Sequence, residues 1–356
     1  MRKRHVIQIL FYLVFGALVI LAMVVSGKLS EEQEAAATKI SEFSVMLEGR
    51  EISALYFDGT YMWVGCNDGL LIYDGDTQEL IKTIDDLEVL YTSGIEQTPD
   101  GTVWIGHEEG MTGIGADGER MDFSYPDLPK GRINTVEWDG RQLWCGSYSG
   151  AARLVMTDEG WSAVQLYGAA DGLISDSVNA IRKNGDELWF ASYLDHRSGG
   201  LTIMENDRIT CIGTEEGLPH PYVTSLQVLP DGAVLAGCGY MESGGLAMVV
   251  KEQGSYQVKE VFDDLDGIPG EKVRYLYYDE NGYLWITTEY DGILIVDFEK
   301  NGLEAPLAGL TYTVDHGLSD NEIKCIAETA DAYWLGGKYG LTLINKSYIE
   351  EQMREE

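Results

Sequence analysis

The chain has 356 residues, with 59 acidic against 25 basic side chains and a formal net charge of −34 at pH 7. Binding to nucleic acid or to an anionic lipid surface needs clustered Lys and Arg, so this charge argues against both functions. The acidic excess keeps the protein soluble and favours neutral or cationic partners.

The N-terminal segment is predicted to anchor the chain in a membrane. An apolar run over residues 6–25 is long enough to cross a bilayer core of roughly 30 Å. It is longer than the apolar core of a cleaved signal peptide, although a cleavage site near Ser26 or within 35–37 is an alternative. The basic residues 2–4 place the N-terminus in the cytoplasm. We therefore expect a cytoplasmic tip over 1–5, a single-pass transmembrane signal-anchor helix over 6–26, a stalk over 27–38 and an extracytoplasmic remainder.

Beyond the stalk, a short apolar stretch around one anchor residue recurs seven times, each time followed by Gly and a small or aliphatic residue. The anchors lie 40 to 50 residues apart and are Trp63, Trp104, Trp144, Trp189, Leu235, Trp285 and Trp334. Recurrence of strand-like units at this spacing is typical of a propeller or a solenoid. An Asx-Gly pair such as Asn281-Gly282 precedes nearly every anchor and suits a tight hairpin turn.

One repeat unit predicts the strands of the others. Its turn residues divide it into strands at 273–278, 283–288 and 292–297, and a fourth follows at 310–314. Four antiparallel strands in such a unit make one propeller blade. The expected fold is an all-β, seven-bladed β-propeller of four-stranded antiparallel blades over 39–346, with the anchors packed between blades. Residues 39–46 are predicted to close the last blade, so that no edge is left unpaired, and 347–356 are expected to form an acidic tail.

The segments 315–344, 171–181 and 266–274 resemble the two-component regulator propeller repeat. In that family a Gly-Leu loop precedes a Val or Ile strand start, a Trp-containing strand and a closing Gly-Leu pair. The resemblance covers 39–345 and is weakest in the fifth unit, where Leu235 replaces Trp. It implies an extracytoplasmic sensor domain that is usually tied to a histidine kinase or cyclase. Since few residues follow the propeller, we expect no output domain in this chain.

The candidate ligand site is a ring of side chains in and beside the loops that join the second and third strands of the blades. These loops share one face, and their phenols and carboxylates could hold a sugar by stacking, or a cation by charge and cation–π contact. The alternative is that each Tyr only covers its turn. The candidates are Tyr148, Tyr193, Tyr240, Tyr290, Tyr339, His107, Asp68, Asp195, Glu242, Glu289 and Asp291.

Catalytic, metal and cofactor motifs find little support. The five cysteines show no zinc-type spacing, and neither a phosphate loop nor a nucleophile elbow is present. We therefore expect no cofactor, no metal and no enzymatic activity. The external histidines fall in loops of the same face, which leaves a His-based lyase as a minor alternative; they are His107, His196, His220 and His316.

The sequence thus favours a membrane-anchored, extracytoplasmic module of the sensor type that binds a small molecule, a glycan or a peptide. Its expected partner is a membrane signalling protein or a transporter, and no nucleic acid. Two alternatives stay open. One is a surface scaffold that docks a membrane partner, and the other is a carbohydrate or peptide lyase.

Overall fold

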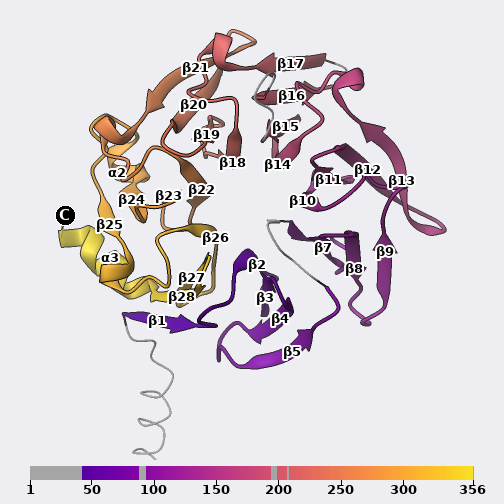
Figure 1. Ribbon diagram of the computed structural model, residues 1–356, viewed down its shortest axis with the longest axis horizontal. Coiled ribbons are helices and arrows are strands. Elements are labelled where there is room, and N and C mark those ends of the chain that lie inside the picture. Colours follow the sequence, from indigo (N-terminus) through magenta and orange to yellow (C-terminus); the bar gives the residue numbers. More distant parts are fainter. Residues whose placement is uncertain (1–41, 88–93, 194–198, 207, 356) are drawn as a thin grey trace, which may run out of the picture. The chain divides into compact units, whose positions relative to one another are not determined.

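The computed structural model describes residues 42–87, 94–193, 199–206 and 208–355. Within these ranges, seven four-stranded antiparallel sheets are arranged as blades around a central channel (Figure 1). The predicted all-β, seven-bladed propeller is therefore confirmed.

Each blade begins with an inner strand beside the channel (Figure 1). The inner strands are β2 (Ile52–Phe57), β6 (Ile95–Gln97), β10 (Ile133–Trp138), β14 (Val178–Asn184), β18 (Val223–Val228), β22 (Val273–Tyr278) and β26 (Ile323–Glu328). The second strands are β3 (Tyr61–Cys66), β7 (Val103–His107), β11 (Leu143–Ser147), β15 (Glu187–Ser192), β19 (Val234–Gly239), β23 (Tyr283–Thr288) and β27 (Ala332–Gly337).

The third and outer strands complete the blades. The third strands are β4 (Gly69–Asp74), β8 (Gly110–Ile114), β12 (Gly150–Thr157), β16 (Leu201–Glu205), β20 (Gly244–Glu252), β24 (Ile293–Asp297) and β28 (Gly340–Asn345). The outer strands are β5 (Leu80–Ile84), β9 (Arg120–Phe123), β13 (Gly160–Tyr167), β17 (Arg208–Ile212), β21 (Ser255–Phe262), β25 (Leu310–Tyr312) and β1 (Phe43–Met46). Single 3₁₀ turns lead from four of the described outer strands towards the next blade, at Ala169–Asp171, Thr214–Glu216, Asp264–Asp266 and Val314–His316.

The anchor residues pack in the core, and in three blades an aspartate of the preceding hairpin helps to hold the anchor, at Trp63, Trp144 and Trp285. Leu235 and Trp285 are both fully buried. The indole N–H of Trp285 donates to a carboxylate oxygen of Asp279 over 2.8 Å, and the indole of Trp63 does the same to Asp58 over 2.8 Å. The hairpin aspartates therefore serve the turn and also accept the hydrogen bond that a buried indole needs.

The first described strand and the last strand of the chain lie side by side. β1 pairs with β28 in register, from Phe43 opposite Ile344 to Met46 opposite Leu341. It forms the outer strand of the seventh blade, the position predicted from the sequence for residues 39–46, of which 39–41 lie outside the described residues. Both ends of the propeller thus belong to one sheet (Figure 1).

The C-terminal segment is not the expected acidic tail but a helix, α3 (Lys346–Glu355). Its apolar side chains Ile349 and Met353 stand one turn apart and are buried. Lys346 is also buried, with its ammonium 2.6 Å from the Glu328 carboxylate. A second short helix, α2 (Phe298–Asn301), packs Phe298 on Tyr278, with the ring centres 5.8 Å apart.

No helix in the described ranges is both long enough and apolar enough to cross a bilayer. The predicted tip, transmembrane helix and stalk all lie in residues 1–41, outside the described residues.

Candidate functional site

Six inner strands of the described chain break register with their neighbours in the same way. In β22, Val273 is opposite Thr288 while Tyr275 is opposite Thr287, so two steps on the inner strand match one step on its partner. This is the pattern of a β-bulge, which gives one extra residue to the inner strand and re-aims its side chain. The six extra residues, called the bulge ring below, are Ser53, Asn134, Asn179, Thr224, Arg274 and Lys324.

Three neutral members of the bulge ring tie adjacent blades together. The Asn134 side-chain amide donates to the carbonyl oxygen of Val178 over 3.0 Å, and the Asn179 amide donates to that of Thr224 over 2.7 Å. The Thr224 hydroxyl continues the series by donating to the carbonyl oxygen of Val273 over 2.6 Å. Each bond reaches the start of the next inner strand, so the wall of the channel is a hydrogen-bonded belt.

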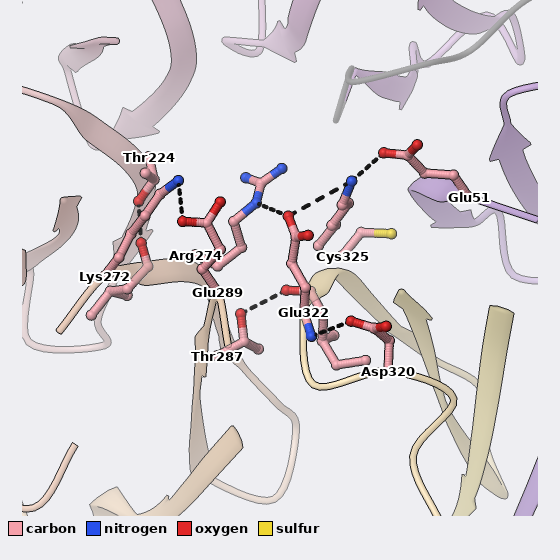
Figure 2. A network of polar contacts seen from close by, with 12 residues as sticks. Glu51, Thr224, Lys272, Arg274, Thr287, Glu289, Asp320, Glu322 and Cys325 are labelled. Carbon is pink, nitrogen blue, oxygen red and sulfur yellow. Dashed lines mark hydrogen bonds and ion pairs between the residues drawn. The ribbon is translucent and has the colours of Figure 1, made fainter. Parts of the chain in front are cut away.

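The charged members continue this belt with ion pairs. Nε of Arg274 donates to Glu322 over 3.2 Å (Figure 2). The Lys324 ammonium bonds to Glu51 and lies 3.7 Å from Glu322. Because Glu51 precedes β2, the Lys324 contact links blade seven to blade one.

The bulge ring lines a cavity of about 200 Å³ at one end of the channel. The cavity lies where the inner strands begin, since the bulge is at the second residue of each strand. Among the described residues that line it, five are cationic and two are carboxylates, in a chain with more than twice as many acidic as basic residues. The charged lining residues are Arg132, Arg182, Lys272, Arg274, Lys324, Glu289 and Glu322.

Most of these cations have one carboxylate partner and are held rigidly. Lys272, only 6% exposed, places its ammonium 2.8 Å from Glu289, and Arg132 places a guanidinium nitrogen 2.7 Å from Glu108. Arg274 differs, because only its Nε is engaged. In Figure 2 its two terminal nitrogens point away from Glu322, and within the described ranges they have no hydrogen-bond partner.

Of the three described phenols that line the cavity, Tyr148 and Tyr193 lie beside cations. The Arg132 guanidinium lies 5.3 Å from the ring centre of Tyr148, and the Lys272 ammonium lies 3.2 Å from the hydroxyl of Tyr193. Burial raises the pKa of Tyr148, against the opposing effect of Arg132, so this hydroxyl stays protonated at neutral pH. Behind Tyr193, aromatic contacts continue through Tyr222 to Tyr240, with ring centres 5.2 Å and 5.4 Å apart.

The structure brings only part of the predicted ring to this cavity. Tyr148, Tyr193 and Glu289 line it. The others in the described ranges lie outside it: Tyr240, Tyr290, Tyr339, Glu242 and Asp291 are exposed, Asp68 pairs with Arg50, and His107 lines a separate hollow on blade two. Asp195 lies outside the described residues.

The loop histidines do not converge. His107 Nε2 lies 3.1 Å from the Thr112 hydroxyl, which donates to Asp122 over 2.6 Å, and burial lowers the pKa of His107. His220 accepts from the backbone N–H of Tyr222 over 3.0 Å. His316 ends a 3₁₀ turn, and His196 lies outside the described residues. The three described loop histidines therefore belong to three different places on the ring.

The sequence interpretation missed the bulge ring, although a signal for it exists. In six repeats, a polar residue directly follows the Val or Ile that opens the inner strand, as in Val273-Arg274 and Ile323-Lys324. Strict alternation would then turn the following residue away from the channel. A bulge at this point explains why Arg274 and Tyr275 both line the cavity.

The opposite end of the channel has different chemistry. A hollow of about 390 Å³ there is lined by the carboxylates of Glu96, Glu137 and Glu328 and by the phenol of Tyr277. Burial, reinforced by the charge of Glu137, raises the pKa of Glu96 to about 8. Arg182 and Tyr275 line both cavities, so they lie between the two ends.

Comparison with known proteins agrees with the repeat pattern. Residues 267–290 match the family model of the two component regulator propeller. This segment contains the bulge residue Arg274 and the anchor Trp285, so the resemblance seen in the sequence is confirmed for this repeat. A search of curated proteins gave no match.

Solved structures share the fold. The extracellular domain of BT3049 from B. thetaiotaomicron, provisionally assigned to a hybrid two component system, has a TM-score of 0.69 at 16% identity, covering 86% of this chain and 41% of that one. The extracellular domain of BT4673 from the same organism, provisionally assigned to a one component system, has a TM-score of 0.63 at 19% identity, with coverages of 86% and 40%. This chain thus spans about two fifths of those domains.

A third similar structure is an enzyme. Virginiamycin B lyase from Staphylococcus aureus has a TM-score of 0.60 at 14% identity, covering 85% of this chain and 99% of that one. At such identities the likeness concerns the fold and carries no activity across.

Proposed function

We propose that this protein is a sensor-type propeller that binds a small ligand in the cavity of the bulge ring. The observation that carries the proposal is Arg274, which lines the cavity with two terminal nitrogens that have no hydrogen-bond partner in the described part of the chain. A rigid polar wall with open donors is what a preformed ligand site requires. The likeness to extracellular domains of signalling systems supports the same role.

The proposal includes a membrane anchor. The apolar run over 6–25, with basic residues before it, would hold the propeller on the extracytoplasmic face. Ligand binding would then be passed to a separate membrane partner, either a signalling protein or a transporter. Fractionation of cells tests this step, since the full chain should sediment with membranes and a chain lacking residues 1–26 should not.

We propose a binding role rather than catalysis. The described loop histidines lie apart from the cavity and from one another, which gives the lyase alternative less support. The cavity also favours ligand binding over a purely scaffolding role, because a docking surface needs no recessed charged wall.

A thermal-shift screen of the purified full chain tests the binding function. Sugars, peptides, polyamines and organic acids would be compared, because a ligand that binds only the native state raises the melting temperature. A compound that raises the melting temperature of the unsubstituted chain should no longer raise that of the Arg274→Gln variant. A screen with no hit, or a hit that is indifferent to every substitution in the bulge ring, would contradict the proposed site.

A further inference from the structure

We infer that the ligand of this cavity is a small organic anion with a planar carboxylate group. The inference rests on the proposed function, and it names the chemical class that the site selects. It departs from the sequence-based expectation of a sugar or a cation, because the acidic residues that suggested a cation mostly lie outside the cavity.

The sign of the charge lining the cavity is the first argument. In the described part of the lining, five cations face two carboxylates, although the chain as a whole has 59 acidic against 25 basic residues. A concave wall with an excess of one sign concentrates ions of the opposite sign. Ion pairs with carboxylates on and behind the wall reduce this excess but leave the terminal nitrogens of Arg274 facing the cavity. A cationic ligand would be repelled at this position, whereas an anion would be attracted.

The geometry of Arg274 is the second argument. Glu322 occupies the Nε side of the guanidinium at 3.2 Å and fixes its orientation. The edge formed by the two terminal nitrogens stays open, as Figure 2 shows. Such an edge offers two parallel N–H donors, which match the two oxygens of a carboxylate.

The neighbouring groups fit the remainder of such a molecule. Lys272 and Lys324 are buried and carry a second and a third positive charge on the same wall. Tyr148 and Tyr193 add aromatic faces and hydroxyls, which suit an apolar or ring-shaped body with a few polar groups. The cavity of about 200 Å³ restricts this body to a small molecule.

Matched probes test the charge preference with the full chain. Each set has one skeleton that carries a carboxylate, an amide or an amine: benzoate, benzamide and benzylamine form one set, and succinate, succinamide and 1,4-diaminobutane form the other. Binding would be measured by titration calorimetry at low and high salt. We expect at least one carboxylate to bind about 10-fold more tightly than its amide, to weaken at high salt, and its amine to bind less tightly still.

Substitutions assign the preference to Arg274. Arg274→Gln should reduce the affinity for the carboxylate probe to that for the matched amide. Arg274→Lys keeps the positive charge but loses the two parallel N–H donors, so its affinity should lie between those of the unsubstituted chain and Arg274→Gln. Arg208→Gln is the matched control, because it removes the same charge from the exposed outer strand β17. The salt dependence of the unsubstituted chain provides a readout even if a variant fails to fold.

The outcomes separate this inference from the proposed function. If the amides or amines bind as tightly as the carboxylates and Arg274→Gln abolishes that binding, the site is real but the anion preference is wrong. If Arg208→Gln weakens carboxylate binding as much as Arg274→Gln does, the preference is a property of overall charge and the inference fails. If no probe of any charge binds, both the inference and the proposed function are overturned.

Discussion

The two ends of the central channel share six inner strands, β2, β10, β14, β18, β22 and β26, yet the side chains that line them differ in charge. Where the inner strands begin, the described residues that line a cavity include five cations and two carboxylates. Where they end, the carboxylates of Glu96, Glu137 and Glu328 line the hollow together with phenols, and Arg182 is its only described cation. Strand β26 shows the contrast by itself, because Lys324 lies near its start, at the basic end of the channel, and Glu328 lies at its last residue, at the acidic end.

The partners of these charges also differ. Glu328 accepts from the hydroxyl of Tyr277 over 2.8 Å and from the backbone N–H of Glu280 over 3.1 Å, and Glu137 accepts from the backbone N–H of Lys183 over 2.8 Å. The acidic end thus directs its hydrogen bonds into the fold, while the basic end keeps the edge of Arg274 open. We conclude that substitutions at the acidic end should change stability, whereas those at the basic end should change binding.

The largest effect is expected beside the acidic end, at Asp279. This carboxylate is 2% exposed and accepts from the Trp285 indole over 2.8 Å, from the Tyr333 hydroxyl over 2.7 Å and from two backbone N–H groups. Asp279→Ala leaves those donors buried without an acceptor and should cost about 3–4 kcal/mol in chemical denaturation. Asp58→Ala, at the equivalent but more exposed place, should cost about 1 kcal/mol. If both variants lost the same free energy of unfolding, the burial of the carboxylate would not determine the size of the loss.

The next effect is expected at Lys346, which anchors α3 at the acidic end. Its buried ammonium lies 2.6 Å from Glu328 and 2.5 Å from Glu280. Lys346→Met leaves the Glu328 carboxylate without its cation and should lower the free energy of unfolding by about 2–3 kcal/mol. Adding Glu328→Gln to this variant should restore part of the lost free energy of unfolding. The control Lys338→Met, at an exposed lysine, should leave the free energy of unfolding almost unchanged. A double variant no better than the single one would argue against charge as the cause.

A smaller, pH-dependent effect is expected at Glu96. Its pKa is raised to about 8 in the folded state by burial and then by Glu137, with Arg182 opposing. An unfolded glutamate titrates near about 4.3, so between that pH and about 8 the folded protein retains a proton that the unfolded chain has lost. The free energy of unfolding therefore falls as pH rises through this window.

Glu96→Gln should remove this loss. The variant should exceed the unsubstituted protein by about 1–2 kcal/mol near pH 8 and equal it near pH 5, as measured by urea denaturation at both pH values. A difference that is the same at both pH values would show that Glu96 does not titrate in this range.

The smallest change in stability is expected at the basic end. Arg274→Gln removes the pair with Glu322 at 3.2 Å, whose side chains are 23% and 12% exposed. Because the Lys324 ammonium stays 3.7 Å from Glu322, the free energy of unfolding should change by only about 1 kcal/mol or less. The same substitution is expected to reduce carboxylate binding to the level of the matched amide. A large loss of free energy of unfolding in Arg274→Gln would contradict the conclusion that the basic end serves binding and the acidic end serves stability.

The architecture could be predicted because its signal is repeated along the chain. The strands expected at 273–278 and 283–288 coincide with β22 and β23, since a buried Trp after an Asx-Gly turn constrains both strands of a hairpin. The C-terminal helix was missed because its apolar contacts are few. Ile349 and Met353, four residues apart, were its only clear periodic signal.

The site was harder to predict than the fold. Sequence reasoning placed Tyr290 and Tyr339 at the channel because their loops share its face, but their side chains are 59% and 57% exposed. It missed Arg274 and Lys324 because regular alternation cannot reveal a register slip, which depends on backbone pairing between strands. Totals of charge over the chain also concealed a local reversal of sign.

The pairing of β1 with β28 has a consequence for biosynthesis. The last sheet cannot form until Ile344 has been synthesised and can pair with Phe43, about 300 residues earlier in the chain. Contacts so distant in sequence form slowly, because a long loop must close before they contribute. Until then the nascent protein exposes two unpaired edges, and its passage to the folded state depends on protection from aggregation during that interval.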